Sequence, residues 1–186
     1  MRKIKLRKVT GFRVKDVNKP IVIRDKRGVL FYDTSPLIPK VKRFNLPAGI
    51  ELYVDSGSFV PMNKPYKYRL SKLPKIQRHK QSNPSNFKIE FGYNPHKATV
   101  YWDQKKIFFD DSFKEKPLPM LYFILYHEFG HKLFKTEKFA DQYAKNMMLK
   151  RGYNPLQIVS AQLWGLSSQN YDRKRYIVKH IINLQR

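Results

Sequence analysis

The pattern of apolar and polar residues changes along the chain, from a strand-like period in the first part to a helical period in the last. Basic and apolar residues alternate over residues 1–9, which predicts a strand with one basic face. Apolar runs at residues 21–24 and 29–32 flank a turn in which Gly28 can take a positive φ. These two runs therefore predict a β-hairpin.

A second hairpin is predicted from residues 49–54 and 58–60, around a turn at residues 55–57. Residues 61–86 are rich in Pro, Lys, Ser and Asn and lack periodicity, so we expect an irregular crossing segment there. Three further strands are predicted at residues 87–91, 98–102 and 106–109, the last two joined by a turn at residues 103–105.

The period of the pattern becomes helical after residue 117. Residues 120–134 are apolar almost all round, which predicts a buried helix. Thr136 can cap a second helix that ends at Gly152. Two shorter helices are predicted next, one opening at Asn154-Pro155 and one over residues 169–183 behind a Ser167 or Ser168 cap. Because the strands come first and the helices after them, the predicted fold class is α+β.

The composition of the 186-residue chain suits a single domain with a buried core, since 41% of the residues are apolar. The chain has 38 Lys and Arg against 14 Asp and Glu, and a formal charge of +24. Residues 1–80 hold 21 of these basic residues and only 5 acidic ones. We therefore distinguish a basic, β-rich region at residues 1–80 from a metal-binding domain at residues 81–186, although the two can form one continuous domain.

The sequence also restricts where the protein acts and what it can bind. The first residues are basic, but no apolar stretch follows them as in a secretory signal, and no apolar run is long enough for a membrane span. We expect a soluble protein in the cytoplasm. Since the chain has no cysteine, it has neither disulfides nor a cysteine metal site. The basic surface would attract a polyanion such as nucleic acid or an acidic protein.

One segment, His127-Glu-Phe-Gly-His131, contains residues suited to catalysis. The two histidines are four residues apart on the predicted helix, so both imidazoles project from one face and can bind one Zn²⁺. Glu128 lies next to the first histidine, where it can accept a proton from water activated by the metal. Gly130 lowers helix stability, but it allows another backbone or a ligand to approach closely.

A zinc site of this kind needs a third protein ligand, and two carboxylates lie shortly downstream. Glu137 and Asp141 share one face of the second helix, and the small Ala140 and Ala144 allow this helix to pack closely on the first. We expect Glu137 to be the third ligand and Asp141 to accept a hydrogen bond from a ligating histidine. The reverse assignment is the alternative, and so is a solvated pair of carboxylates with no metal.

The remaining candidates have weaker signals. Tyr126 and Tyr143 can donate hydrogen bonds to a developing oxyanion. Either strand 98–102 or strand 106–109 can form a sheet edge to which an extended peptide adds. The other histidines are expected to be surface or structural residues: His79, His96 and His180.

The motif His127-Glu-Phe-Gly-His131, followed by Glu137-x-x-Ala-Asp141, resembles those of zincin-like metallopeptidases of the gluzincin type. The resemblance implies a small twisted sheet packed on the two motif helices. It also implies zinc bound by both histidines and Glu137, with Glu128 as the catalytic base. The spacer between the motifs is very short for these peptidases. Residues 87–158 look like short zincin-like proteins of tailed bacteriophages, crAss-like phages among them, and so do residues 46–49 and 54–59.

These observations support three functions. The first is a zinc metallopeptidase that acts on a peptide or protein substrate. The second is a virion component that keeps the zincin fold, with the basic region docked on neighbouring phage proteins or DNA. The third is a nucleic-acid-binding protein, although no known binding motif is present. The resemblance implies a place in the host cytoplasm, or within a phage particle.

Overall fold

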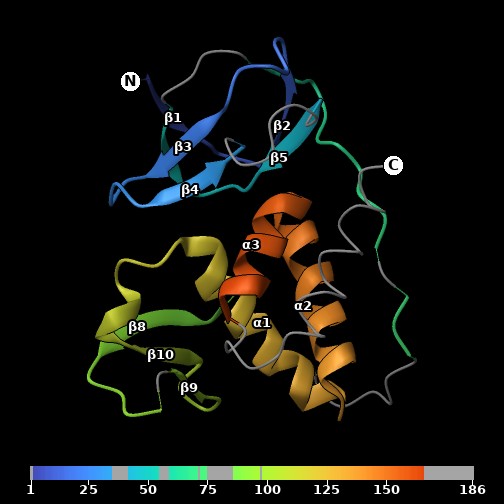
Figure 1. The fold of residues 1–186 in the computed structure, drawn as a ribbon. Coiled ribbons are helices and arrows are strands. Elements are labelled where there is room, and N and C mark those ends of the chain that lie inside the picture. The colour runs from blue at the N-terminus through green and yellow to red at the C-terminus, as the bar shows by residue number, and fades with distance from the viewer. Residues whose placement is uncertain are drawn as a thin grey trace.

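The computed structural model describes residues 2–34, 42–54, 59–70, 72–74, 86–96 and 98–165. Their strands come first and their helices last, which confirms the α+β class. Figure 1 shows the N-terminal strands as an upper layer above the helices, with a second group of strands beside the helices. None of the helices in these ranges is both long enough and apolar enough to cross a membrane.

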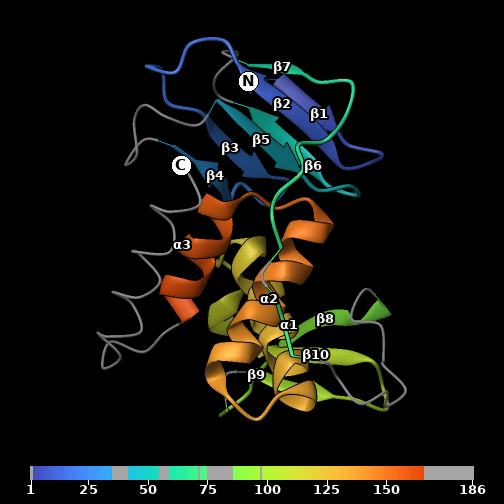
Figure 2. The same ribbon diagram turned by 90° about the vertical axis from the view of Figure 1, so that its right-hand side faces the viewer.

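The N-terminal strands form two antiparallel sheets, with strand orders β1-β6-β3-β4 and β5-β2-β7. Figure 2 shows both sheets at the same end of the molecule. The strands are β1 (Arg2–Lys5), β2 (Thr10–Val14), β3 (Val22–Asp25), β4 (Leu30–Asp33), β5 (Arg43–Leu46), β6 (Glu51–Val54) and β7 (Phe59–Pro61).

The first predicted hairpin is confirmed, since β3 pairs with β4 and Gly28 takes a φ of 76°. The second is wrong, because β6 pairs with β1 and β3 whereas β7 pairs with β2 in the other sheet. The apolar side chains explain the difference. Leu52 of β6 is buried in its own sheet, but Phe59 of β7 packs edge-on against Phe12 and Phe44 of the other sheet. The predicted turn at 55–57 lies outside the described residues.

Two strands, β2 and β5, were not expected from the sequence. The strand predicted over residues 1–9 is shorter, and the chain passes into β2 after it. Phe12 and Phe44 lie opposite each other and stack with ring centroids 5.4 Å apart. Burial of these two rings holds together two segments that have few apolar residues of their own.

The third sheet contains β8 (Lys88–Gly92), β9 (Ala98–Tyr101) and β10 (Lys106–Asp110) in the order β8-β10-β9. All three strands agree with those predicted. Because β10 is central, the option that residues 106–109 form a sheet edge is wrong. β9 does form an edge, as the other option required. In the described parts of the predicted crossing segment, residues 62–70 and 72–74 contain no helix or strand.

Three predicted helices are confirmed: α1 (Leu118–Leu133), α2 (Glu137–Arg151) and α3 (Pro155–Gly165). Their ends have the expected local chemistry. The Thr136 hydroxyl accepts a hydrogen bond from the Phe139 amide, and Gly152 ends α2 with a φ of 99°. The predicted helix at residues 169–183 lies outside the described residues.

Helix α1 is buried on opposite sides, as its apolar sequence predicted. Leu121, Leu125 and Phe129 face the third sheet. Tyr126 belongs instead to a core that also contains Phe31 of β4. The N-terminal strands and the helices thus share one apolar core.

Polar contacts also join the N-terminal strands to the helical part. The Arg27 guanidinium pairs with buried Asp25 and donates hydrogen bonds to the carbonyls of Lys114 and Lys116, just before α1. The Gln157 side-chain amide on α3 donates to the Phe31 carbonyl at 2.7 Å. These contacts fix the helices relative to the hairpin of β3 and β4.

Candidate metal centre

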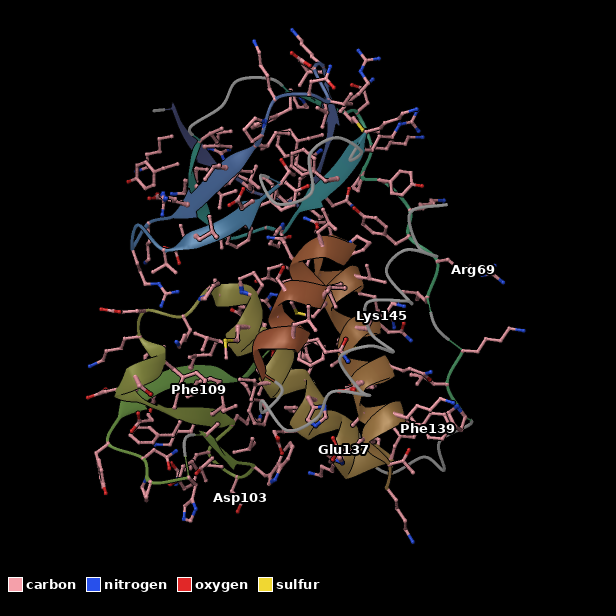
Figure 3. The ribbon with its side chains drawn as sticks, in the orientation of Figure 1. Arg69, Asp103, Phe109, Glu137, Phe139 and Lys145 are labelled. Carbon is pink, nitrogen blue, oxygen red and sulfur yellow. The ribbon has the colours of Figure 1, made fainter. Side chains whose placement is uncertain are left out.

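The close crossing of α1 and α2 determines the geometry of the site. A methyl group added at Gly130 on α1 would lie 2.6 Å from the Cα atom of Ala140 on α2. Carbon atoms do not approach this closely, so only glycine allows the two backbones to touch here. The contact places the first turn of α2 against the last turn of α1. Figure 3 shows Glu137 at this end of the helices.

Three predicted ligands meet at this crossing. The Nε2 atoms of His127 and His131 lie 2.9 Å apart. The Glu137 carboxylate places one oxygen 3.4 Å from the first of these nitrogens and the other oxygen 3.0 Å from the second. The possible ligand atoms of the three residues all lie within 4.8 Å of one another, so the group could hold a metal ion.

The spacing of the donors suits a small cation. Two nitrogens at about 2.0–2.1 Å from a tetrahedral Zn²⁺ lie about 3.3 Å apart, close to the separation found here. Two imidazole nitrogens and a carboxylate are electron-pair donors, and they converge on one point without a basic side chain between them. A cation would satisfy all three donors together, which a single shared proton cannot do.

Asp141 lies on the other side of the His127 ring, with Oδ1 at 2.9 Å from Nδ1. Nδ1 is buried and has no well-aligned hydrogen-bond partner, so the two atoms are close but not ideally oriented. A carboxylate at Nδ1 favours the proton there and leaves the lone pair on Nε2, toward the other donors. The side chain of Asp141 is only 12% exposed, unlike a solvated surface carboxylate. Glu137, not Asp141, is placed beside both Nε2 atoms.

Glu128 is partly buried on the turn that carries His127. Among the residues that the structure describes, no hydrogen bond or ion pair of its carboxylate is found. This carboxylate is therefore free to accept a proton from a bound molecule.

The two candidate tyrosines lie elsewhere. The Tyr126 hydroxyl is in the core and accepts a hydrogen bond from the Arg151 guanidinium at 3.2 Å. Burial raises the pKa of Tyr126, and burial also raises that of Tyr143, whose ring packs against Phe134. Neither tyrosine has a recorded contact with the candidate ligands, so the prediction of an oxyanion donor gains no support. Arg151, which the sequence did not single out, holds Tyr126 and Tyr122 in the core.

The remaining histidines give no second site within the described ranges. His96 lies in the turn before β9, where its backbone amide donates to the Asn94 side chain at 3.0 Å. His79 and His180 lie outside the described residues.

The surroundings of the centre are basic and partly open to solvent. The His131 side chain is 32% exposed and that of Glu137 57%. Lys132, Lys135 and Lys138 are exposed near them. The ammonium of Lys132 lies 4.5 Å from the centre of the Trp102 ring, just beyond edge strand β9. No sequence signal indicated this pair, because its residues are far apart in the chain.

No family model, curated protein or solved structure matches the chain. The functional argument therefore rests on the residues of the site and on the similarity of their motifs.

Proposed function

We propose that this protein is a zinc-dependent metallopeptidase of the gluzincin type, with a zincin-like fold. The observation that carries the proposal is the meeting of His127, His131 and Glu137 at the crossing of α1 and α2. Two histidines and one glutamate are a donor set that zinc hydrolases use. An HExxH helix followed by an ExxAD helix supports the same conclusion.

Each residue of the centre has a separate role in this proposal. His127, His131 and Glu137 would hold the ion, and Asp141 would fix the ring orientation of His127. When bound, Zn²⁺ would supply Lewis acidity, which polarises a carbonyl and lowers the pKa of water to about 7. Glu128 would accept the proton of the attacking water and donate it to the leaving amine. Its lack of a partner within the described residues suits both transfers.

The position of the centre suits a polypeptide substrate. The ligands lie at the surface near the end of the helices, where an extended chain can reach them. β9 is an edge strand, so its unpaired backbone groups can pair with such a chain. We therefore expect peptide or protein substrates.

Two measurements test the proposal. Elemental analysis of the purified protein should find about one zinc per chain, and His131→Ala should lose it. Cleavage of a peptide library by the wild type should disappear in Glu128→Gln, which keeps the ligands and the size of the side chain. Metal-free wild-type protein that also fails to bind added zinc would remove the site.

The alternative function is a virion component that keeps the zincin fold and uses its basic surface for docking. The basic N-terminal strands favour it, because they lie at the opposite end from the candidate metal centre. Stoichiometric zinc without cleavage of any peptide, together with incorporation in a phage particle, would support this alternative over the peptidase.

A further inference from the structure

Two arginines lie directly opposite each other on one face of an N-terminal sheet. Arg13 of β2 pairs in register with Arg43 of β5, and both side chains are exposed. Opposed residues in antiparallel strands have Cβ atoms only about 4.5–5.5 Å apart, so two like charges at such positions repel each other. Two arginines at this spacing need either a carboxylate partner or an external anion.

The described part of the chain provides no carboxylate for these arginines. Neither arginine forms an ion pair with a described residue. The described acidic residues before β8 have partners elsewhere: Asp16 with Lys19, Asp25 with Arg27, Glu51 with Lys3, and Asp33 through an interaction of its own.

The strand alternation separates this basic face from the core. Phe12 and Phe44, the neighbours of the two arginines along the strands, stack on the buried side of the sheet. Since successive side chains point to opposite faces, the arginines project away from the core.

The same face is extended by the segment that follows β7. Asn45 holds this segment through two hydrogen bonds with the backbone of Tyr66, at 2.7 and 2.8 Å. Gly11 allows the close approach, because a methyl group there would lie 2.9 Å from the Lys64 carbonyl oxygen. The segment thus adds an aromatic ring, 41% exposed at Tyr66, and the exposed Lys64 to the face. Figure 3 shows Arg69, farther along, pointing away from the body of the molecule.

We propose that this face, formed by Arg13, Arg43, Lys64 and Tyr66, binds the sugar–phosphate backbone of a nucleic acid. Guanidinium groups bind phosphate oxygens through paired hydrogen bonds, and phosphates along a strand supply the regular negative charges that two adjacent arginines need. An exposed tyrosine beside them can stack on an unpaired base. No other described feature of the face reads base identity, so the binding is independent of sequence. It does not depend on the proposed peptidase activity.

The test is binding of fluorescent single-stranded and duplex DNA of mixed sequence, measured by anisotropy at several salt concentrations. The variant is Arg13→Gln/Arg43→Gln in the full chain. We expect affinity to fall about tenfold or more, and the slope of log affinity against log salt to fall by about 1 to 1.5. The matched control, Lys88→Gln/Lys116→Gln, removes the same charge from exposed positions outside this face and should change affinity less than about twofold.

Several results would overturn the proposal. Equal losses in the two double variants would show that net charge alone attracts DNA. An acidic peptide or an anionic lipid vesicle that binds more tightly than DNA, and through the same two arginines, would replace nucleic acid by that partner. A thermal melt keeps the result interpretable, because the arginine variant relieves a repulsion and should unfold no earlier than the wild type.

Discussion

Gly130 and Ala140 are in backbone contact where α1 crosses α2, and a methyl group at Gly130 would overlap the Cα atom of Ala140. Gly130 belongs to the HExxH motif and Ala140 to the ExxAD motif. The contact therefore sets the distance between the two histidines and Glu137. A residue that ligates nothing determines whether the three donors meet.

Gly130→Ala should destabilise the protein and weaken zinc binding together. Alanine improves helix propensity by about 1 kcal/mol, but overpacking against a backbone costs about 1–3 kcal/mol or more, so the clash wins. Chemical denaturation and zinc competition measure the two effects.

Gly92→Ala is the matched control for this substitution. Its new methyl group would meet the far end of the Phe108 ring, which can move aside, so a smaller loss of stability is expected with zinc affinity unchanged. Equal zinc affinity in Gly130→Ala and the wild type would contradict the role of the helix contact.

Glu137→Ala and Asp141→Ala should differ in their effect on zinc. The first removes a proposed ligand and should abolish stoichiometric binding. The second removes the carboxylate beside Nδ1 of His127 and should lower zinc affinity about 10–100-fold. Titration against a chelator measures both, with exposed Glu115→Ala as a carboxylate control. If Asp141→Ala loses all zinc while Glu137→Ala retains it, the two assignments must be exchanged.

A fragment containing only residues 81–186 should not fold into a native structure. In the full chain, Phe31 of β4 packs against Tyr153 at a ring separation of 5.9 Å, and both belong to the core shared with α1. Removing the N-terminal strands would expose this face to water. Near-ultraviolet circular dichroism and dye binding would detect the loss of packing, and a sharp cooperative melt of the fragment would show instead that residues 81–186 form an independent domain.

The parts of the structure that could be predicted depend on short spacings. The caps at Thr136 and Gly152, the two histidines one turn apart and the small Ala140 are all local signals, and the helices agree with them. Strand pairing is not local. The second hairpin was wrong because Phe59 finds its partners, Phe12 and Phe44, more than ten residues away in another sheet.

Tyr32→Phe should stabilise the protein, most clearly at alkaline pH. The Tyr32 hydroxyl is buried without a hydrogen-bond partner in the described part of the chain, and burial raises its pKa well above the usual value. A raised pKa means that the stability present below about pH 10 is lost as the pH rises toward the folded-state pKa. Phenylalanine keeps the stacking on Phe44 and removes the unsatisfied group, for a gain of about 1–2 kcal/mol.

Urea unfolding from neutral to alkaline pH checks this prediction. The wild type should lose stability more steeply than the variant above about pH 10. Tyr101→Phe is the control, since that ring is 41% exposed and should not change the profile. A loss of stability in Tyr32→Phe would mean that the hydroxyl has a partner that stabilises the fold.

Arg43→Glu should raise stability and lower DNA affinity in the same variant. Glutamate opposite Arg13 would turn a repulsive cross-strand pair into an attractive one, worth about 0.2–1 kcal/mol, and the gain should shrink with added salt because the pair is exposed. DNA binding should weaken, since one proposed phosphate contact is lost and a negative charge takes its place. Thermal melts and DNA anisotropy at low and high salt measure both effects. A chain that keeps two opposed arginines at a cost in stability is expected to use them, and a variant that gains stability with unchanged DNA affinity would show that they serve another partner.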